Sequence, residues 1–320
     1  MLDRQVIEAI ELQDTDYLLR AVDRLCANAD WELLVVLRDR CREALTRGRQ
    51  LWGIDEHVRY RLALEAPGQW AGPAVTEGPA RFTLGPLAEV AASTKRWNDL
   101  APHLEHGPSR ATVAAERVVR GDSIDGEIPD LPGKLQVWEP VYPLATYKPD
   151  KVETPAPALP RLVPAELPEG ADIVDDTDSE GALSDLVSPW TTESNGRSQV
   201  VTVDGDSMAA IRGLGLSNAR VGELSPQSAL SWLAWTGASG GAHGRRRGAA
   251  AGRYAAWWVV ATLSDLEWPP DPVRVGDGLA RMGWWWFDDG APGTGWQVRL
   301  AVEDPGSGLA WAISAVDQAD

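Results

Sequence analysis

The sequence contains little cysteine and no long apolar run. The first argues against a disulfide-stabilised protein, and the second argues against a membrane-spanning one. Among its 320 residues there are 2 cysteines, Cys26 and Cys41, both inside segments with helical periodicity. Such a pair is no disulfide framework and indicates a reducing compartment. The longest apolar run, residues 254–263, is far below the roughly 18 residues that a membrane-spanning helix needs. The N-terminus lacks a basic stretch followed by an apolar one, so we expect no signal peptide, no membrane association and a cytoplasmic protein.

Positive charge is scarce as well. Lys and Arg number 30 against 47 Asp and Glu, which gives a formal net charge of -17. Phosphate groups repel such a surface, because binding to nucleic acids depends on their neutralisation by Lys and Arg. Nucleic acid is therefore an unfavourable partner, and basic protein partners are favoured. The basic residues are almost all Arg, which together with abundant Ala, Gly and Pro indicates a GC-rich bacterial genome.

The signatures of phosphate-binding loops and metal sites are also missing. The sequence contains no G-x-x-x-x-G-K-[ST], and no G-x-G-x-x-G follows an expected strand. His103 and His106 lack a Cys or carboxylate cluster that would complete a ligand set. Residues 176–181 follow the first half of a calcium loop, but Val187 stands where the bidentate Glu is needed. We therefore expect no metal and no cofactor.

Residues 1–121 are expected to form an all-helical domain, either a bundle or a HEAT-like stack. Asp14 and Asp30 stand where they can cap helices, and Gly48 and Gly121 stand where helices can end. Between these signals apolar residues recur at helical spacing. Short helices joined by tight turns are typical of docking platforms, so we expect a docking domain.

Proline changes the character of residues 122–185. Ten of the 23 prolines lie between Pro129 and Pro168. Proline fixes φ and removes a backbone donor, which disfavours both helices and central strands. We expect a Pro-rich, acidic linker whose apolar first half is packed. Its second half, with the acidic stretch 172–180, is expected to be exposed and disordered.

Residues 186–320 are expected to form a Trp-rich α+β domain. Its last three apolar segments, residues 284–287, 296–303 and 309–316, are separated by turns rich in Gly. We interpret them as a β-meander whose central segment buries one face and exposes the other. Helices are expected on one face of a largely antiparallel sheet. The fold class is therefore multidomain, α and α+β.

One stretch breaks the acidic pattern. Residues 239–253 are rich in Gly and Arg and lie within residues 224–264, which contain no Asp or Glu. A glycine-rich loop at a helix N-terminus binds phosphate or carboxylate through backbone N–H groups and nearby basic side chains. Small residues at four-residue intervals instead favour close helix packing, with the arginines paired to acidic surfaces. Those small residues are Gly244, Gly248, Gly252 and Ala256.

Both interpretations define the same candidate site for an anion or a partner. Its residues are Arg197, Ser239, Gly240, Gly241, His243, Arg245, Arg246, Arg247 and Arg253. Glu193 and His243 are the candidates for acid–base chemistry, since Glu193 lies in a polar turn that can face the Gly-Arg stretch. The adjoining Asn195-Gly196 is typical of a simple turn, which is the alternative to an acid–base role for Glu193.

Tryptophan is the most unusual component, with 16 Trp against 2 Phe. Neighbours such as Trp257 and Trp258 diverge, so either some tryptophans lie at an interface or the core is exceptionally rich in Trp. The sequence predicts a non-catalytic cytoplasmic adaptor or structural component that binds a protein partner or larger assembly. Its helical domain and its Trp/Arg-rich domain are the expected contacts. The alternative is an enzyme or ligand-binding module that holds a small anion at the Gly-Arg stretch.

Overall fold

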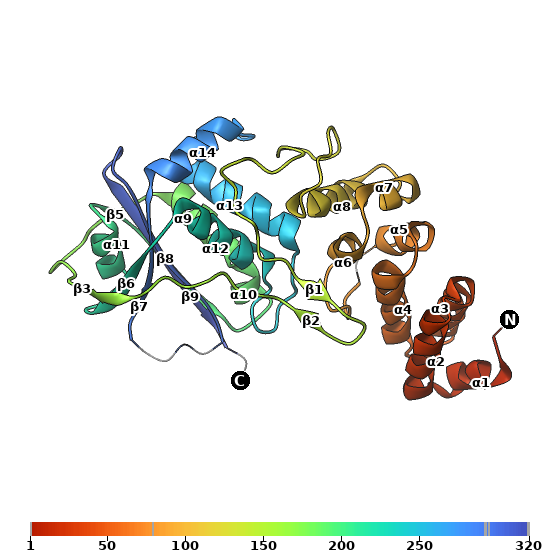
Figure 1. The fold of residues 1–320 in the computed structure, drawn as a ribbon. Coiled ribbons are helices and arrows are strands. Elements are labelled where there is room, and N and C mark those ends of the chain that lie inside the picture. The colour runs from red at the N-terminus through yellow and green to blue at the C-terminus, as the bar shows by residue number, and fades with distance from the viewer. Residues whose placement is uncertain (1, 79, 291–292, 294, 319–320) are drawn as a thin grey trace. The chain divides into compact units, whose positions relative to one another are not determined.

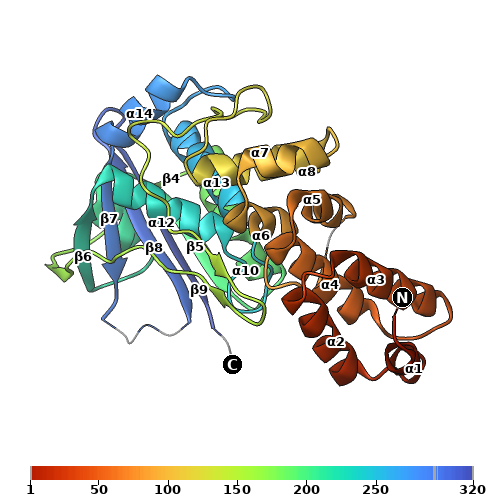
Figure 2. The same ribbon diagram turned by 45° about the vertical axis from the view of Figure 1, so that its right-hand side comes forward.

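The computed structural model describes residues 2–78, 80–290, 293 and 295–318 and divides the chain into two compact units (Figures 1 and 2). The helical unit comprises Met1–Ile128 and Ala145–Glu153, and the sheet unit comprises Pro129–Leu144 and Thr154–Asp320. One unit is built from helices and the other from an antiparallel sheet with helices, so the predicted multidomain α and α+β fold is confirmed. Within the described residues no helix combines the length and the apolar character needed to span a membrane.

Short helices make up most of the helical unit. They are α1 (Arg4–Leu12), α2 (Thr15–Ala27), α3 (Trp31–Thr46), α4 (Trp52–Glu65), α5 (Gly68–Thr76), α6 (Leu87–Thr94), α7 (Trp97–Leu100), the 3-10 turn η1 (Ala101–His103) and α8 (Pro108–Val119). Asp14 caps α2 as expected, accepting a hydrogen bond from the Tyr17 N–H at 2.9 Å. Asp30 precedes α3 without a side-chain cap. Helix α5 begins directly after Pro67, which occupies its N-cap position.

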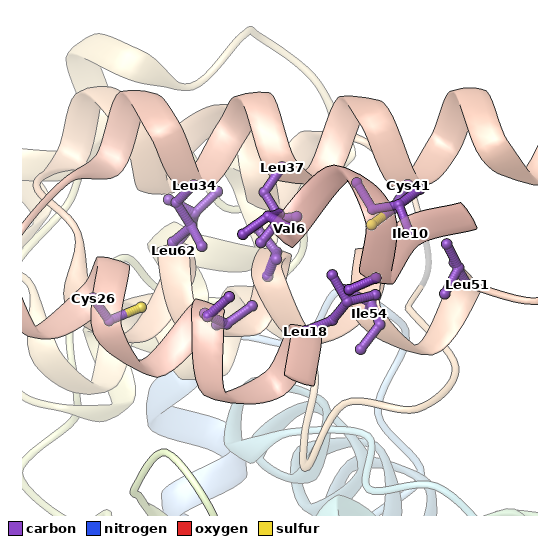
Figure 3. Close-up of a cluster of buried hydrophobic side chains, with 14 of the residues drawn as sticks. Val6, Ile10, Leu18, Cys26, Leu34, Leu37, Cys41, Leu51, Ile54 and Leu62 are labelled. Atoms are coloured by element: carbon purple, nitrogen blue, oxygen red, sulfur yellow. The ribbon is translucent and has the colours of Figure 1, made fainter. Parts of the chain in front are cut away.

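Apolar faces of α1 to α4 meet in one core. Figure 3 shows Leu34, Leu37 and Cys41 of α3 in this cluster with Val6 and Ile10 of α1. Both cysteines of the chain are free and buried in it. Burial raises the pKa of each thiol to about 12, so both stay protonated at neutral pH and serve as small apolar side chains.

A hairpin from the Pro-rich segment completes the helical unit. Its strands are β1 (Thr146–Tyr147) and β2 (Val152–Glu153), which pair antiparallel. The Tyr147 hydroxyl donates to Glu89 Oε2 at 2.6 Å, and Glu89 is fully buried in α6. This residue pair anchors the hairpin, because a carboxylate buried at that depth requires hydrogen-bond donors.

Seven antiparallel strands form the sheet of the second unit, in the order β3-β6-β7-β8-β9-β5-β4. They are β3 (Val163–Ala165), β4 (Asp172–Val174), β5 (Arg197–Asp204), β6 (Ala219–Leu224), β7 (Gly283–Asp288), β8 (Trp296–Asp304) and β9 (Leu309–Asp317). The helices are α9 (Thr177–Leu186), α10 (Ser188–Thr192), α11 (Ser207–Gly213), α12 (Pro226–Ala238), α13 (Ala249–Leu263) and α14 (Pro272–Arg281). The predicted meander is confirmed as β7-β8-β9.

Helices cover both faces of this sheet, which corrects the expectation of one covered and one wet face. On β7, Phe287 packs with Ile211 of α11. Its neighbour Trp286 contacts Trp232 of α12, with ring centroids 4.3 Å apart. Successive side chains of a strand point to opposite faces, so α11 and α12 lie on opposite sides, as Figure 1 shows. Ala301 of β8, on the face expected to be wet, is therefore completely buried.

The Pro-rich segment reaches both edges of the sheet. β3 pairs with β6 at one edge and β4 pairs with β5 at the other, and only residues 166–171 connect them. A flat sheet of seven strands is about 29 Å wide. The connection can span at most about 25 Å. The sheet must therefore curl so that its two edges approach each other.

The acidic stretch 172–180 is largely exposed, as expected, but it is not disordered, since it forms β4 and the start of α9. Ile173 pairs in register with Val203 of β5. In α9 the apolar side chains of Ala182 and Leu183 are buried. The acidic composition obscured these contacts, because the apolar residues that order the stretch are few and mostly follow it.

Candidate functional site

The Gly-Arg loop, residues 239–248, connects α12 and α13 and is held by carboxylates of the same chain. The Ala242 N–H donates to Asp317 Oδ2 at 2.5 Å. The Arg245 N–H donates to Glu193 Oε2 at 3.2 Å. The sequence prediction that Glu193 faces this loop thus has a geometric counterpart, with Glu193 as an acceptor from the backbone. The N–H groups of Ala242 and Arg245 are engaged within the protein.

Glycine is required at two adjacent positions of the loop. Gly241 has φ +74°, and a Cβ there would lie 2.1 Å from Asp317 Oδ2. A Cβ at Gly240 would lie 2.2 Å from the backbone carbon of Arg245. The Gly241 N–H donates to Ser239 Oγ at 2.9 Å. These glycines and Ser239 therefore shape a tight turn around a buried carboxylate.

Of the four small residues spaced four apart, only Gly252 and Ala256 lie on a helix. Helix α13 begins at Ala249, so Gly244 and Gly248 lie in the loop, and Gly248 has φ +101°. The prediction of one continuous helical stripe is wrong at those two positions, because the left-handed backbone of Gly248 ends the loop there. Gly252 does serve close packing, since a Cβ there would lie 2.1 Å from the Ala234 carbonyl oxygen of α12.

The remaining basic side chains of the predicted site have different surroundings. His243, Arg245 and Arg247 are exposed in the loop. Arg197 is exposed at the first position of β5. Arg246 is half-buried and lines a small cavity of about 10 Å³ beside Trp235. A cavity of that size holds about one water molecule.

Arg253, the last residue of the predicted set, lies in the interior of the sheet unit. Its side chain is 2 % exposed and faces Glu139, which is 0 % exposed. The guanidinium donates from Nε to Glu139 Oε2 at 2.7 Å and from Nη2 to Oε1 at 2.8 Å. Further donations reach the carbonyl oxygens of Pro132 and Lys134. Arg253 therefore fastens the first part of the Pro-rich segment to α13.

Glu139 collects donors from several parts of the chain. The Tyr142 hydroxyl donates to Oε2 at 2.7 Å, and the Trp257 Nε1–H donates to the same oxygen at 3.1 Å. Burial alone raises the pKa of this carboxyl, but the hydrogen bonds and the charge of Arg253, with smaller contributions from Tyr142 and the Gln136 N–H, outweigh it. The pKa of Glu139 is consequently lowered, and the carboxylate is ionised at neutral pH.

A groove of about 750 Å³ lies on another side of the sheet unit. We call it the acidic groove, because its charged lining residues are Asp176, Asp178, Asp185, Asp265 and Asp304 against the single Arg281. Three tryptophans, Trp258, Trp268 and Trp311, also line it. Its residues come from α9, α13, α14, β8 and β9 and from the turns beside them. None of them belongs to the set predicted from sequence.

Helix α9 supplies one acidic wall. Asp176 caps this helix by accepting from the Ser179 N–H at 3.2 Å, and it also accepts from Trp311 Nε1 at 3.0 Å. Burial raises the pKa of Asp176, but the hydrogen bonds from Ser179 and Trp311 together lower it by more. The pKa of Asp176 therefore lies below its ordinary value. Asp178 and Asp185 are exposed and lie seven residues apart, which places them on one side of the helix.

An ion pair between Arg281 and Asp304 lies in the groove. Arg281, the last residue of α14, donates from Nε to Asp304 Oδ1 at 3.0 Å and from Nη2 to Oδ2 at 3.1 Å. The Gly306 N–H donates to Asp304 Oδ1 at 2.9 Å. Burial raises the pKa of Asp304, and the Arg281 and Gly306 hydrogen bonds lower it, with a net downward shift.

The tryptophans of the sheet unit are chiefly core residues. Seven of them are buried, namely Trp190, Trp232, Trp235, Trp257, Trp284, Trp286 and Trp311. Trp258 and Trp268 are partly exposed, and their ring centroids lie 5.1 Å apart in an edge-to-face contact. The Trp-rich core therefore extends to the surface at the acidic groove.

The helical unit has a groove of its own, of about 550 Å³, beside Lys95. The Lys95 ammonium donates to the carbonyl oxygens of Ala63 and Leu64 at 2.6 and 3.1 Å and to Thr94 Oγ1 at 3.1 Å. Burial lowers its pKa to about 8. Lys95 thus satisfies carbonyl groups at the end of α4, which is a structural task. Across the described part of the chain, no group of three or more His, Cys, Asp or Glu side chains could hold a metal ion.

Over residues 16–319 the chain matches a family of unknown function (DUF6183), a match that covers residues of both units. No curated protein matches the chain, and no solved structure matches it.

Proposed function

The chain belongs to this family of unknown function, and we propose that it is a non-catalytic, protein-binding adaptor or structural component. In this proposal the acidic groove of the sheet unit holds a positively charged segment of a partner protein. The helical unit provides a second contact.

The charge of the groove carries this proposal. Five aspartates and one arginine line it, within a chain of net charge -17. A concave surface lined by one sign of charge concentrates ligands of the opposite sign and steers their approach. The partly exposed Trp258 and Trp268 add aromatic surface, which is enriched where proteins bind one another. A basic peptide segment matches both properties.

Exposed aromatic side chains support the second contact. Trp52 of α4 is 41 % exposed and Phe82 is 60 % exposed, and their ring centroids lie 3.9 Å apart. Large apolar side chains that remain exposed side by side are typical of interaction surfaces. The free, buried cysteines fit a reducing compartment such as the bacterial cytoplasm, where we place the protein.

The contacts of the Gly-Arg loop favour binding at the groove over an anion site at the loop. The N–H groups of Ala242 and Arg245 already donate to carboxylates of the chain. An anion at those groups would have to displace Asp317 or Glu193. At the groove, by contrast, exposed carboxylates such as Asp178 and Asp185 face no such competition for a cation.

A peptide-binding experiment tests the proposal. The full chain is titrated into fluorescent decapeptides, one basic and one acidic, and fluorescence anisotropy is measured at several salt concentrations. We expect binding of the basic peptide alone, weakened by salt. The double substitution Asp178→Lys and Asp185→Lys should reduce the affinity about tenfold or more, because like charges then meet.

The control is a charge change of the same size outside the groove. Glu169→Lys with Glu223→Lys alters two exposed carboxylates of the sheet unit that do not line the groove. If both double variants weaken binding equally, net charge and not the groove governs the interaction. If the basic peptide does not bind at all, the proposal is wrong.

A further inference from the structure

We infer that the acidic groove binds a guanidinium group, that Asp304 is the residue that receives it, and that Arg281 holds this position in the free protein. This inference rests on the proposed function and specifies it, since it names the side chain of the partner. The ligand is an arginine side chain within a basic segment of a protein.

The geometry of the internal pair gives the first reason. Arg281 approaches Asp304 with Nε and Nη2 on the two carboxylate oxygens, at 3.0 and 3.1 Å. This forked arrangement matches a planar guanidinium to a carboxylate, and an ammonium group cannot reproduce it. The Gly306 N–H fixes the same carboxylate from another direction. Asp304 is therefore held in an orientation suited to a guanidinium.

The two members of the pair differ in exposure. The Asp304 side chain is 7 % exposed, whereas the Arg281 side chain is 46 % exposed. The carboxylate thus lies in the protein, and the guanidinium reaches it from the solvent side at the end of α14. An ion pair with so exposed a partner contributes little to stability. An arginine from outside can replace Arg281 without loss of any hydrogen bond at Asp304.

The surroundings complete the match. Trp258, Trp268 and Trp311 line the groove with Asp304, and guanidinium groups stack on aromatic rings better than ammonium groups do. Three further lining aspartates are exposed, Asp178, Asp185 and Asp265, so the groove stays negative after Arg281 and Asp304 pair. An arginine accompanied by other basic residues therefore fits better than an isolated lysine.

The test compares a decapeptide of arginine with one of lysine on the full chain. Wild-type protein should bind the arginine peptide several-fold more tightly. Arg281→Gln should raise the affinity for the arginine peptide about tenfold, because the position at Asp304 becomes vacant, and should change the lysine peptide much less. Asp304→Asn should remove the preference for arginine. Arg274→Gln, an exposed arginine of the same helix outside the groove lining, is the matched control.

Each result has a defined meaning. If arginine and lysine peptides bind equally and Arg281→Gln behaves like Arg274→Gln, the inference is overturned while the proposed function stands. If neither peptide binds, both fall. Should Asp304→Asn fail to fold, competition against the bound arginine peptide replaces it: methylguanidinium must displace the peptide at lower concentration than methylammonium, and equal potency contradicts the inference.

Discussion

Among the forked arginine–carboxylate pairs of the sheet unit, Arg253–Glu139 and Arg281–Asp304 lie in contrasting surroundings. Arg253 and Glu139 are 2 % and 0 % exposed, and Tyr142 and Trp257 add donors to the same carboxylate. Arg281 and Asp304 are 46 % and 7 % exposed. In the first pair, removing either partner leaves the charge of the other buried and unpaired. In the second only the carboxylate is buried, so its arginine can be exchanged.

Burial, more than the hydrogen bonds themselves, thus decides whether such a pair serves stability or recognition. A buried pair fastens two segments of chain because separating it leaves an uncompensated charge. A pair that is open to solvent on the arginine side has water as a substitute partner.

Removing the buried arginine should destabilise the sheet unit most. Arg253→Ala leaves Glu139 buried without its main partner, and we expect a loss of about 3–5 kcal/mol in the free energy of unfolding. Urea denaturation followed by tryptophan fluorescence measures it. The double variant Arg253→Met with Glu139→Leu removes both charges and should lose much less. A loss below about 1 kcal/mol for Arg253→Ala would contradict the role assigned to this pair.

Filling the close contact between α12 and α13 at Gly252, next to Arg253 in the sequence, should cost less stability. Gly252→Val forces the two helices apart, because its Cβ alone would meet the Ala234 carbonyl oxygen at 2.1 Å. We expect a loss of about 1–3 kcal/mol by the same denaturation assay. Gly181→Ala in α9 is the control, since no atom lies within 4 Å of its added Cβ. That variant should be unchanged or slightly more stable.

Acid should weaken the buried pair. The folded-state pKa of Glu139 is lowered, so its contribution to stability is complete above the ordinary pKa near 4.5 and is lost as the pH falls through the lowered value. Wild type and Glu139→Gln are compared by urea denaturation between neutral pH and about pH 3.5, below the ordinary glutamate pKa. The stability difference between them should shrink toward acid pH. A difference that stays constant would show that ionisation of Glu139 does not matter.

The exposed arginine should matter least for stability. Arg281→Ala is expected to change the free energy of unfolding by about 0–1 kcal/mol. Arg274→Ala on the same helix serves as the reference for loss of one exposed positive charge. A loss for Arg281→Ala as large as that for Arg253→Ala would abolish the distinction between the two pairs.

Local signals in the sequence located several elements well. Asp14 caps α2 as expected, and Asp206 and Asp271 cap α11 and α14. The alternating pattern in residues 296–303 identified the central strand of the meander. These features depend on neighbours a few residues away, which is why periodicity and capping chemistry reveal them.

Contacts between distant residues were not visible. Arg253 was placed in an anion or partner site, but its partner Glu139 lies 114 residues earlier, within a segment that its prolines marked as a linker. The acidic groove joins Asp176 to Trp311 across 135 residues. Its one local signal was the resemblance of residues 176–181 to half a calcium loop, which supplies Asp176 and Asp178. The sequence showed the negative charge of this segment. It could not show that Trp258, Trp268 and Trp311 lie beside it, because only the fold brings them together.

The strands at the two borders of the sheet have a further consequence. A bordering strand offers free N–H and C=O groups to any strand that comes near, and long borders invite polymerisation. Here β3 and β4 have three residues each, and Pro164 at the centre of β3 has no N–H to offer. Both strands come from one Pro-rich segment, so that segment covers the backbone of β6 on one side of the sheet and of β5 on the other. Deleting it would bare β5 and β6, and fibre formation would then be the expected outcome.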